Sequence, residues 1–144
     1  APQFRQSAMP AMFATPVPPI APRPRVLVVD DQADAADALG LLLDELGYDT
    51  SVAYGALEAV QQATRFLPDL VMVDLHMPRI DGFDTARAIR ACRLPSQPVL
   101  VAVTGDIRAD TRRAADEAGF DYQLLKPTPQ PLLEAVMRRA LAAA

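Results

Sequence analysis

Five short strand-like runs alternate with helical stretches along this chain, and that alternation constrains the fold more than any other feature of the sequence. The runs cover residues 25–29, 50–53, 70–73, 99–103 and 121–125. The first, third and fourth are continuously apolar, which is typical of strands buried on both faces of a parallel sheet. Because crossovers between parallel strands are right-handed, helices are expected on both sides of that sheet. The pattern predicts one α/β domain with a doubly wound, five-stranded parallel sheet.

The stretches between these runs have the periodicity of helices that bury one face. The first stretch ends at Gly47, which is a suitable helix C-cap. Its buried face is expected to carry Ala35, Leu39, Leu42, Leu43 and Leu46. The other helices are expected over residues 56–66, 83–92, 108–118 and 131–141.

The first 24 residues differ in composition from the rest of the chain. They hold seven of the 14 prolines, with no glycine and no acidic residue. Such a segment lacks backbone donors and apolar periodicity, so an extended or disordered linker is expected over residues 1–24. A plain tether is favoured over a docking motif for a proline-recognising partner. The folded domain is expected over residues 25–144.

Charge and cysteine content exclude several classes of protein. The formal net charge of −4 argues against a general nucleic-acid binder, which would carry a basic face. A single cysteine, Cys92, leaves no internal disulfide or cysteine metal cluster and is typical of a reducing compartment. No apolar run approaches the ~20 residues that span a bilayer, and no secretion signal is evident. A cytoplasmic protein without direct membrane contact is the expectation.

Polar residues stand where four of the apolar runs end. Asp30 and Asp31 follow the first run, Asp74 the third, Thr104 the fourth and Lys126 the fifth. In open α/β sheets, ligands bind at the carboxyl ends of the strands. Taken singly, each residue has an ordinary explanation as a helix cap or turn residue. If these strands are neighbours, however, all five side chains converge on one crevice, which indicates a site.

The chemistry of this residue set favours phosphoryl transfer. Three carboxylates close together repel one another unless a cation joins them, and hard oxygen ligands without histidine or thiolate select Mg²⁺. A carboxylate such as that of Asp74 can act as the nucleophile and form an acyl phosphate. Lys126 is the only lysine among 14 basic residues, which suggests that its position needs a compact ammonium rather than a guanidinium.

Four blocks of sequence occur in order, with their spacing. They are Val-Leu-Val-Val-Asp-Asp at 26–31, Asp-Leu-His-Met-Pro-Arg-Ile-Asp-Gly at 74–82, Val-Thr-Gly at 103–105 and Leu-Lys-Pro at 125–127. Together they resemble the receiver domain of two-component response regulators, over about residues 25–142. The resemblance implies a flavodoxin-like fold with the strand order 2-1-3-4-5.

The resemblance also implies roles for individual residues. Asp74 stands at the phosphoacceptor position. Asp31 and Asp74 would bind Mg²⁺ together with the main-chain carbonyl of His76, and Asp30 would act mainly through water. The His76 side chain is expected at the rim of the site.

Two further residues would contact the phosphoryl group, namely Thr104 and Lys126. Lys126-Pro127 stands where receivers have a cis peptide bond, which an X–Pro sequence permits. The implied phosphodonors are a histidine kinase or a histidine phosphotransfer protein. Receivers also catalyse their own loading from small phosphodonors and their own dephosphorylation, so the chain is expected to be a signalling phosphoacceptor rather than an enzyme with a separate substrate.

One position departs from the receiver pattern, and another is expected to affect the lifetime of the phosphorylated state. Gln123 stands where many receivers have an aromatic residue or histidine, with Tyr122 on the opposite side of the strand. Three alternatives stay open for the output: a hydrogen bond made by Gln123, backbone movement around residues 105–108, or a simple relay of phosphate. Asp106, two residues after Thr104, is expected to affect the lifetime of the phosphorylated state.

Rival interpretations also stay open. One rival is a phosphohydrolase of the haloacid-dehalogenase type, which also uses an aspartate nucleophile and Mg²⁺. Those enzymes carry an Asp-x-Asp motif after their first strand, whereas the first run here ends in adjacent aspartates. A receiver-like interaction module without the chemistry is a second rival, although all five site residues are present. Within the favoured class, the chain is either a single-domain regulator or the receiver of a hybrid histidine kinase.

Overall fold

The computed structural model describes residues 22–76, 81–105 and 108–142. Its five strands form one parallel sheet in the order β2-β1-β3-β4-β5. The strands are β1 (Arg25–Val29), β2 (Asp49–Ala53), β3 (Leu70–Asp74), β4 (Val99–Thr104) and β5 (Tyr122–Leu125). The helices are α3 (Ala33–Glu45), α4 (Ala56–Phe66), α5 (Gly82–Ala91), α6 (Ala109–Ala118) and α7 (Gln130–Ala142). The doubly wound fold and the strand order predicted from the sequence are confirmed.

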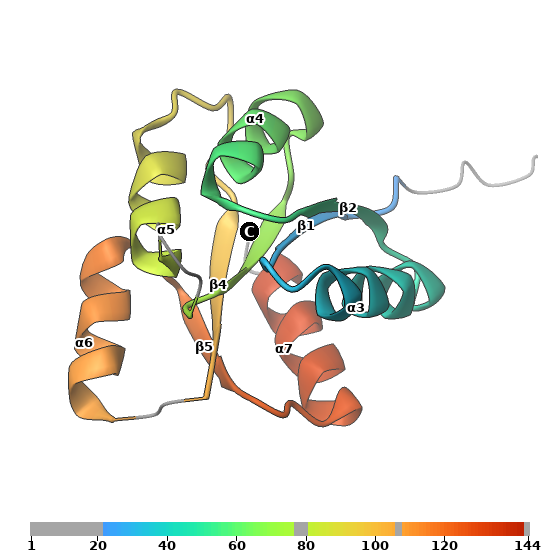
Figure 1. The fold of residues 1–144 in the computed structure, drawn as a ribbon. Coiled ribbons are helices and arrows are strands. Elements are labelled where there is room, and N and C mark those ends of the chain that lie inside the picture. Colours follow the sequence, from blue (N-terminus) through green and yellow to red (C-terminus); the bar gives the residue numbers. More distant parts are fainter. Residues whose placement is uncertain (1–21, 77–80, 106–107, 143–144) are drawn as a thin grey trace, which may run out of the picture.

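The helices cover both faces of the sheet (Figure 1). Side chains of α4, α5 and α6 pack on one face, where Ile89 and Ala115 are buried against Val71, Leu100 and other strand residues. Side chains of α3 and α7 pack on the other face, around Leu43 and Met137. Because β1 and β3 lie inside the sheet, both of their faces are buried, which explains the apolar stretches 26–29 and 70–73.

Several element ends differ by one residue from the sequence prediction. Asp74 and Thr104 are the last residues of β3 and β4 rather than the first residues after them. The reason is pairing, because Asp74 is in register with Val103 and Thr104 with Leu125. Helix α5 begins at Gly82 because the carboxylate of Asp81 accepts the N–H of Asp84 at 2.9 Å as an N-cap.

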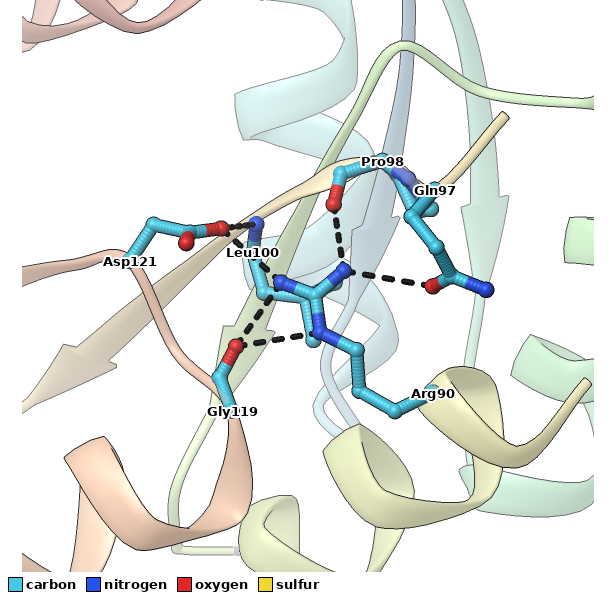
Figure 2. Close-up of polar contacts among 6 residues, drawn as sticks. All are labelled: Arg90, Gln97, Pro98, Leu100, Gly119 and Asp121. Carbon is cyan, nitrogen blue, oxygen red and sulfur yellow. Dashed lines mark hydrogen bonds and ion pairs between the residues drawn. The ribbon is translucent and has the colours of Figure 1, made fainter.

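Arg90 near the end of α5 connects that helix to β4 and β5. Figure 2 shows its guanidinium in contact with the carbonyls of Gly119 (2.8 and 3.1 Å) and Pro98 (2.7 Å), Gln97 Oε1 (3.2 Å) and Asp121 Oδ2 (2.9 Å). The same Asp121 oxygen accepts the N–H of Leu100 at 2.9 Å. Gly119 has φ of 104° and ends α6 in the left-handed conformation, which directs its carbonyl to Arg90 without a Cβ in the way.

The short described stretch before β1 is attached to the domain. Arg23 donates to the carbonyls of Asp44 (2.7 Å), in the last turn of α3, and of Gly47 (2.9 Å) and Tyr48 (2.7 Å), which follow that helix. Residues 1–21, where most of the predicted linker falls, lie outside the described part of the chain. Among the described residues, no helix is both long and apolar enough to cross a membrane.

Candidate functional site

Three carboxylates meet at the carboxyl end of the sheet, where the sequence predicted a crevice. Carboxylate oxygens of Asp30, Asp31 and Asp74 lie within 4.8 Å of one another. They come together because β1 and β3 are hydrogen-bonded neighbours and each ends at this edge. Asp30 is 9% exposed and Asp74 6%, so two of the three charges are largely withdrawn from water.

The Asp74 carboxylate has a defined partner on each oxygen. The backbone N–H of His76 donates to Oδ1 at 3.0 Å, and Lys126 Nζ lies 3.1 Å from Oδ2. Lys126 is placed by its own backbone N–H, which donates to the Thr104 carbonyl at 2.7 Å. The Lys126-Pro127 peptide bond is cis, as the resemblance implies. The only lysine of the chain therefore neutralises the candidate acceptor.

Asp30 carries charge that this single ammonium does not balance. Burial raises the pKa of the Asp30 carboxyl, and the charge of Asp74 adds to the rise. The N–H of Gln32, which donates to Asp30 Oδ1 at 3.0 Å, and the charge of Lys126 oppose it. An uncompensated acid within a group of hard oxygen ligands is suited to a divalent cation of the Mg²⁺ type.

Thr104 has a partner that the sequence interpretation missed. Its hydroxyl oxygen lies 3.3 Å from Nε2 of His76, while Thr104 itself is 1% exposed. The exposed His76 ring therefore folds back over the site from its rim. The signal was available, since His76 is the only histidine and follows the candidate acceptor by two residues.

Gly82 also shapes the site in a way the sequence interpretation did not identify. A Cβ on Gly82 would lie 2.5 Å from the carbonyl oxygen of Asp74 and 2.7 Å from Cα of Leu75. Its N–H faces the Leu75 carbonyl at 3.3 Å. The first turn of α5 thus packs directly on the backbone that presents the acceptor carboxylate, and only glycine leaves room for it.

Gln123 makes a hydrogen bond in this structure, and the three alternatives for the output stay predictions. Its side-chain amide donates to the backbone carbonyl of Arg112 in α6 at 3.1 Å. Tyr122, on the opposite side of β5, packs with the α7 side of the core. Gln123 therefore connects β5 to α6 through one polar contact. Asp106 lies outside the described residues.

All five predicted site residues, Asp30, Asp31, Asp74, Thr104 and Lys126, therefore gather at one edge of the sheet. Of the three acids, Asp31 is the half-buried one. The roles of these residues and of the His76 carbonyl stay predictions. The arrangement offers a nucleophilic carboxylate, two neighbouring carboxylates for a cation, a hydroxyl and an ammonium.

Comparison with known families decides the class. The family model described as the response regulator receiver domain matches residues 26–138. The chain belongs to the response regulator receiver domain family. Receiver domains of response regulators receive phosphoryl groups from histidine kinases and act in two-component signal transduction.

Similar proteins are found in several bacteria. The receiver is 38% identical over 120 residues to an uncharacterised 14.6 kDa protein of Leptolyngbya boryana, covering 81% of this chain and 90% of that protein. It is 36% identical over 104 residues to the transcriptional regulatory protein PrrA of Mycobacterium tuberculosis, covering 72% of this chain but 44% of PrrA. The chain thus spans less than half the length of that regulator.

A solved receiver domain matches the fold closely. It is the receiver of the sensor histidine kinase PA1611 from Pseudomonas aeruginosa, with a TM-score of 0.75 and 25% identity. The match covers 83% of this chain and 98% of that one. That structure was determined with a magnesium ion coordinated in its active-site cleft.

Proposed function

We propose that this receiver domain accepts a phosphoryl group on Asp74 from a phosphohistidine of a histidine kinase or a histidine phosphotransfer protein. The observation that carries the proposal is the convergence of Asp30, Asp31 and Lys126 on the Asp74 carboxylate. A carboxylate oxygen of Asp74 attacks phosphorus, a P–O bond forms, and the P–N bond to the donor imidazole breaks. The nitrogen keeps the bonding electron pair and takes a proton from solvent.

The residues present fit a bound Mg²⁺. Asp31 and Asp74 would hold the ion directly and Asp30 mainly through water, with the His76 carbonyl as the further ligand expected from the family. The magnesium site in the PA1611 receiver supports this assignment. When bound, Mg²⁺ supplies positive charge that offsets the carboxylates and the transferring phosphoryl group.

The remaining site residues bind and orient the phosphoryl group. Lys126 already lies against Asp74, so its ammonium is available to neutralise a phosphoryl oxygen without moving far. The Thr104 hydroxyl would donate to a second oxygen, in exchange for its contact with His76. The acyl phosphate is then hydrolysed in the same site. The domain therefore catalyses only its own phosphorylation and dephosphorylation.

The test is incubation with Mg²⁺ and acetyl phosphate, followed by intact mass measurement. A gain of about 80 Da, one HPO₃, is expected in the wild-type chain and in the matched control Asp116→Asn, whose carboxylate is exposed on α6. Asp74→Asn should show no gain. A gain that survives in Asp74→Asn contradicts the assignment of the acceptor, and a wild-type chain that never labels indicates an interaction module without the chemistry. Steady turnover of a phosphate ester would support the phosphohydrolase instead.

A further inference from the structure

The edge strand β2 has backbone N–H and C=O groups that are not hydrogen-bonded to any other strand of the described chain. It pairs with β1 on one side only (Figure 1). Asp49 N–H and the Ala53 carbonyl bond toward β1. In a parallel strand, the N–H and C=O groups of consecutive residues point alternately to one side of the strand and to the other. Thr50 and Val52 therefore point their N–H and C=O groups to the open edge. Such groups are a template for another extended chain.

A groove runs beside this edge on the α3 side. It has a volume of about 470 Å³ and is lined by Asp37, Gly40, Leu41, Asp44, Thr50 and Val52. Its floor is closely packed, because the Thr50 hydroxyl donates to the Gly40 carbonyl at 3.3 Å, and a Cβ on Gly40 would lie 3.0 Å from Val52. Leu41 is 67% exposed above it, which makes an apolar contact available next to the open backbone.

The charge of this part of the chain is one-sided. Residues 26–64 contain eight acidic residues and no arginine, lysine or histidine. Two of the acids belong to the site already described, and the other six are Asp34, Asp37, Asp44, Glu45, Asp49 and Glu58. Three of these have partners nearby: Arg23 lies 3.3 Å from Asp44, the Tyr54 hydroxyl donates to Asp37 at 2.5 Å, and the Tyr54 N–H donates to Glu58 at 3.2 Å. The surroundings of the edge stay strongly acidic.

We propose that the β2 edge binds an extended basic segment of a partner protein as a sixth strand. Alternate side chains of such a strand point to opposite faces of the sheet. Apolar side chains on one face would cover Leu41, while backbone bonds to Thr50 and Val52 supply affinity and arginine or lysine side chains meet the acidic rim. A second copy of this chain fits poorly, since pairing two β2 edges would bring two acidic rims together.

The test uses the 144-residue chain and a peptide of about eight residues that alternates arginine with valine and has an acetylated N-terminus and an amidated C-terminus. Amide hydrogen exchange by NMR is the readout. Exchange at Thr50 and Val52 is expected to slow with the peptide, whereas Ser51, which already faces β1, should not change. Raising the salt concentration should weaken binding. A peptide N-methylated at alternate residues, and one with glutamate in place of arginine, are expected not to protect either amide.

Matched variants locate the contact. Leu41→Ser should weaken peptide binding by at least about fivefold, because it removes the apolar cover. Leu132→Ser, at a leucine of α7 that is 48% exposed, should leave the affinity unchanged. Both residues are exposed, so neither variant is expected to unfold.

The proposal is wrong if the peptide does not bind at about 1 mM, or if it binds without protecting the Thr50 and Val52 amides. It is also wrong if the Leu41→Ser and wild-type chains bind the peptide with equal affinity. A dimer of the peptide-free chain that protects the same two amides would likewise overturn it. The experiment is independent of the phosphoacceptor assignment, because neither Leu41 nor the β2 edge contributes to the Asp74 site.

Discussion

The Arg90 guanidinium makes five hydrogen bonds that connect α5 to the segments before β4 and β5, and replacing it should weaken the fold measurably. Arg90→Met keeps the aliphatic stem and removes the guanidinium. Three of the lost bonds, two to the Gly119 carbonyl and one to the Pro98 carbonyl, are partly buried. At about 1 kcal/mol net each, they contribute about 3 kcal/mol. The exposed contacts to Gln97 and Asp121 add little.

The expected result is a loss of about 3 kcal/mol in the free energy of unfolding and a Tm lower by roughly 10 °C. Urea unfolding followed by circular dichroism measures the first quantity and thermal unfolding the second. Arg90→Lys should recover less than half of the loss, because one ammonium cannot reach carbonyls on both sides.

Arg87→Met is the matched control. Its guanidinium pairs with Asp84 at 2.9 Å on the exposed side of the same helix, and the two side chains are 56% and 58% exposed. This pair should contribute under about 0.5 kcal/mol. If Arg90→Met loses no more stability than Arg87→Met, the hydrogen bonds of Arg90 do not stabilise the fold.

Three further predictions concern the site. Gly82→Ala should cost at least about 2 kcal/mol in urea unfolding, because its Cβ would collide with the Asp74 backbone, whereas Gly55→Ser, at an N-cap with open space, should cost almost nothing. Asp30→Asn should raise the unfolding free energy of the metal-free chain at pH 7. Burial raises the Asp30 pKa, so the wild-type chain is stabilised when Asp30 is protonated and loses that stability as pH rises through this pKa. Urea unfolding in EDTA from pH 4 to 7 should therefore show a flatter dependence of the unfolding free energy on pH in the variant than in wild type. His76→Ala should change the unfolding free energy by under about 1 kcal/mol but shift the Thr104 and Gly105 amide resonances; unchanged resonances would mean that His76 does not contact Thr104 in solution.

The fold was predictable because its signals are local. Continuous apolar runs marked β1, β3 and β4, and helical periodicity marked the segments between them. The candidate site followed from the same pattern, since parallel strands that run in one direction bring their last residues to one edge. The single-residue errors at Asp74 and Thr104 arose because strand ends depend on pairing with a neighbouring strand, which is not a local property.

The sequence by itself determined which residues stand at the strand ends, and therefore which carboxylates, hydroxyl and ammonium meet at Asp74. Only the tertiary structure decided how these groups are held: the His76 ring at Thr104, Gly82 against the Asp74 carbonyl, and Gln123 on the Arg112 carbonyl. Arg90 and the open edge of β2 belong to the same category. These contacts join residues far apart in the chain or depend on the packing of one element on another, so periodicity and spacing carry no record of them.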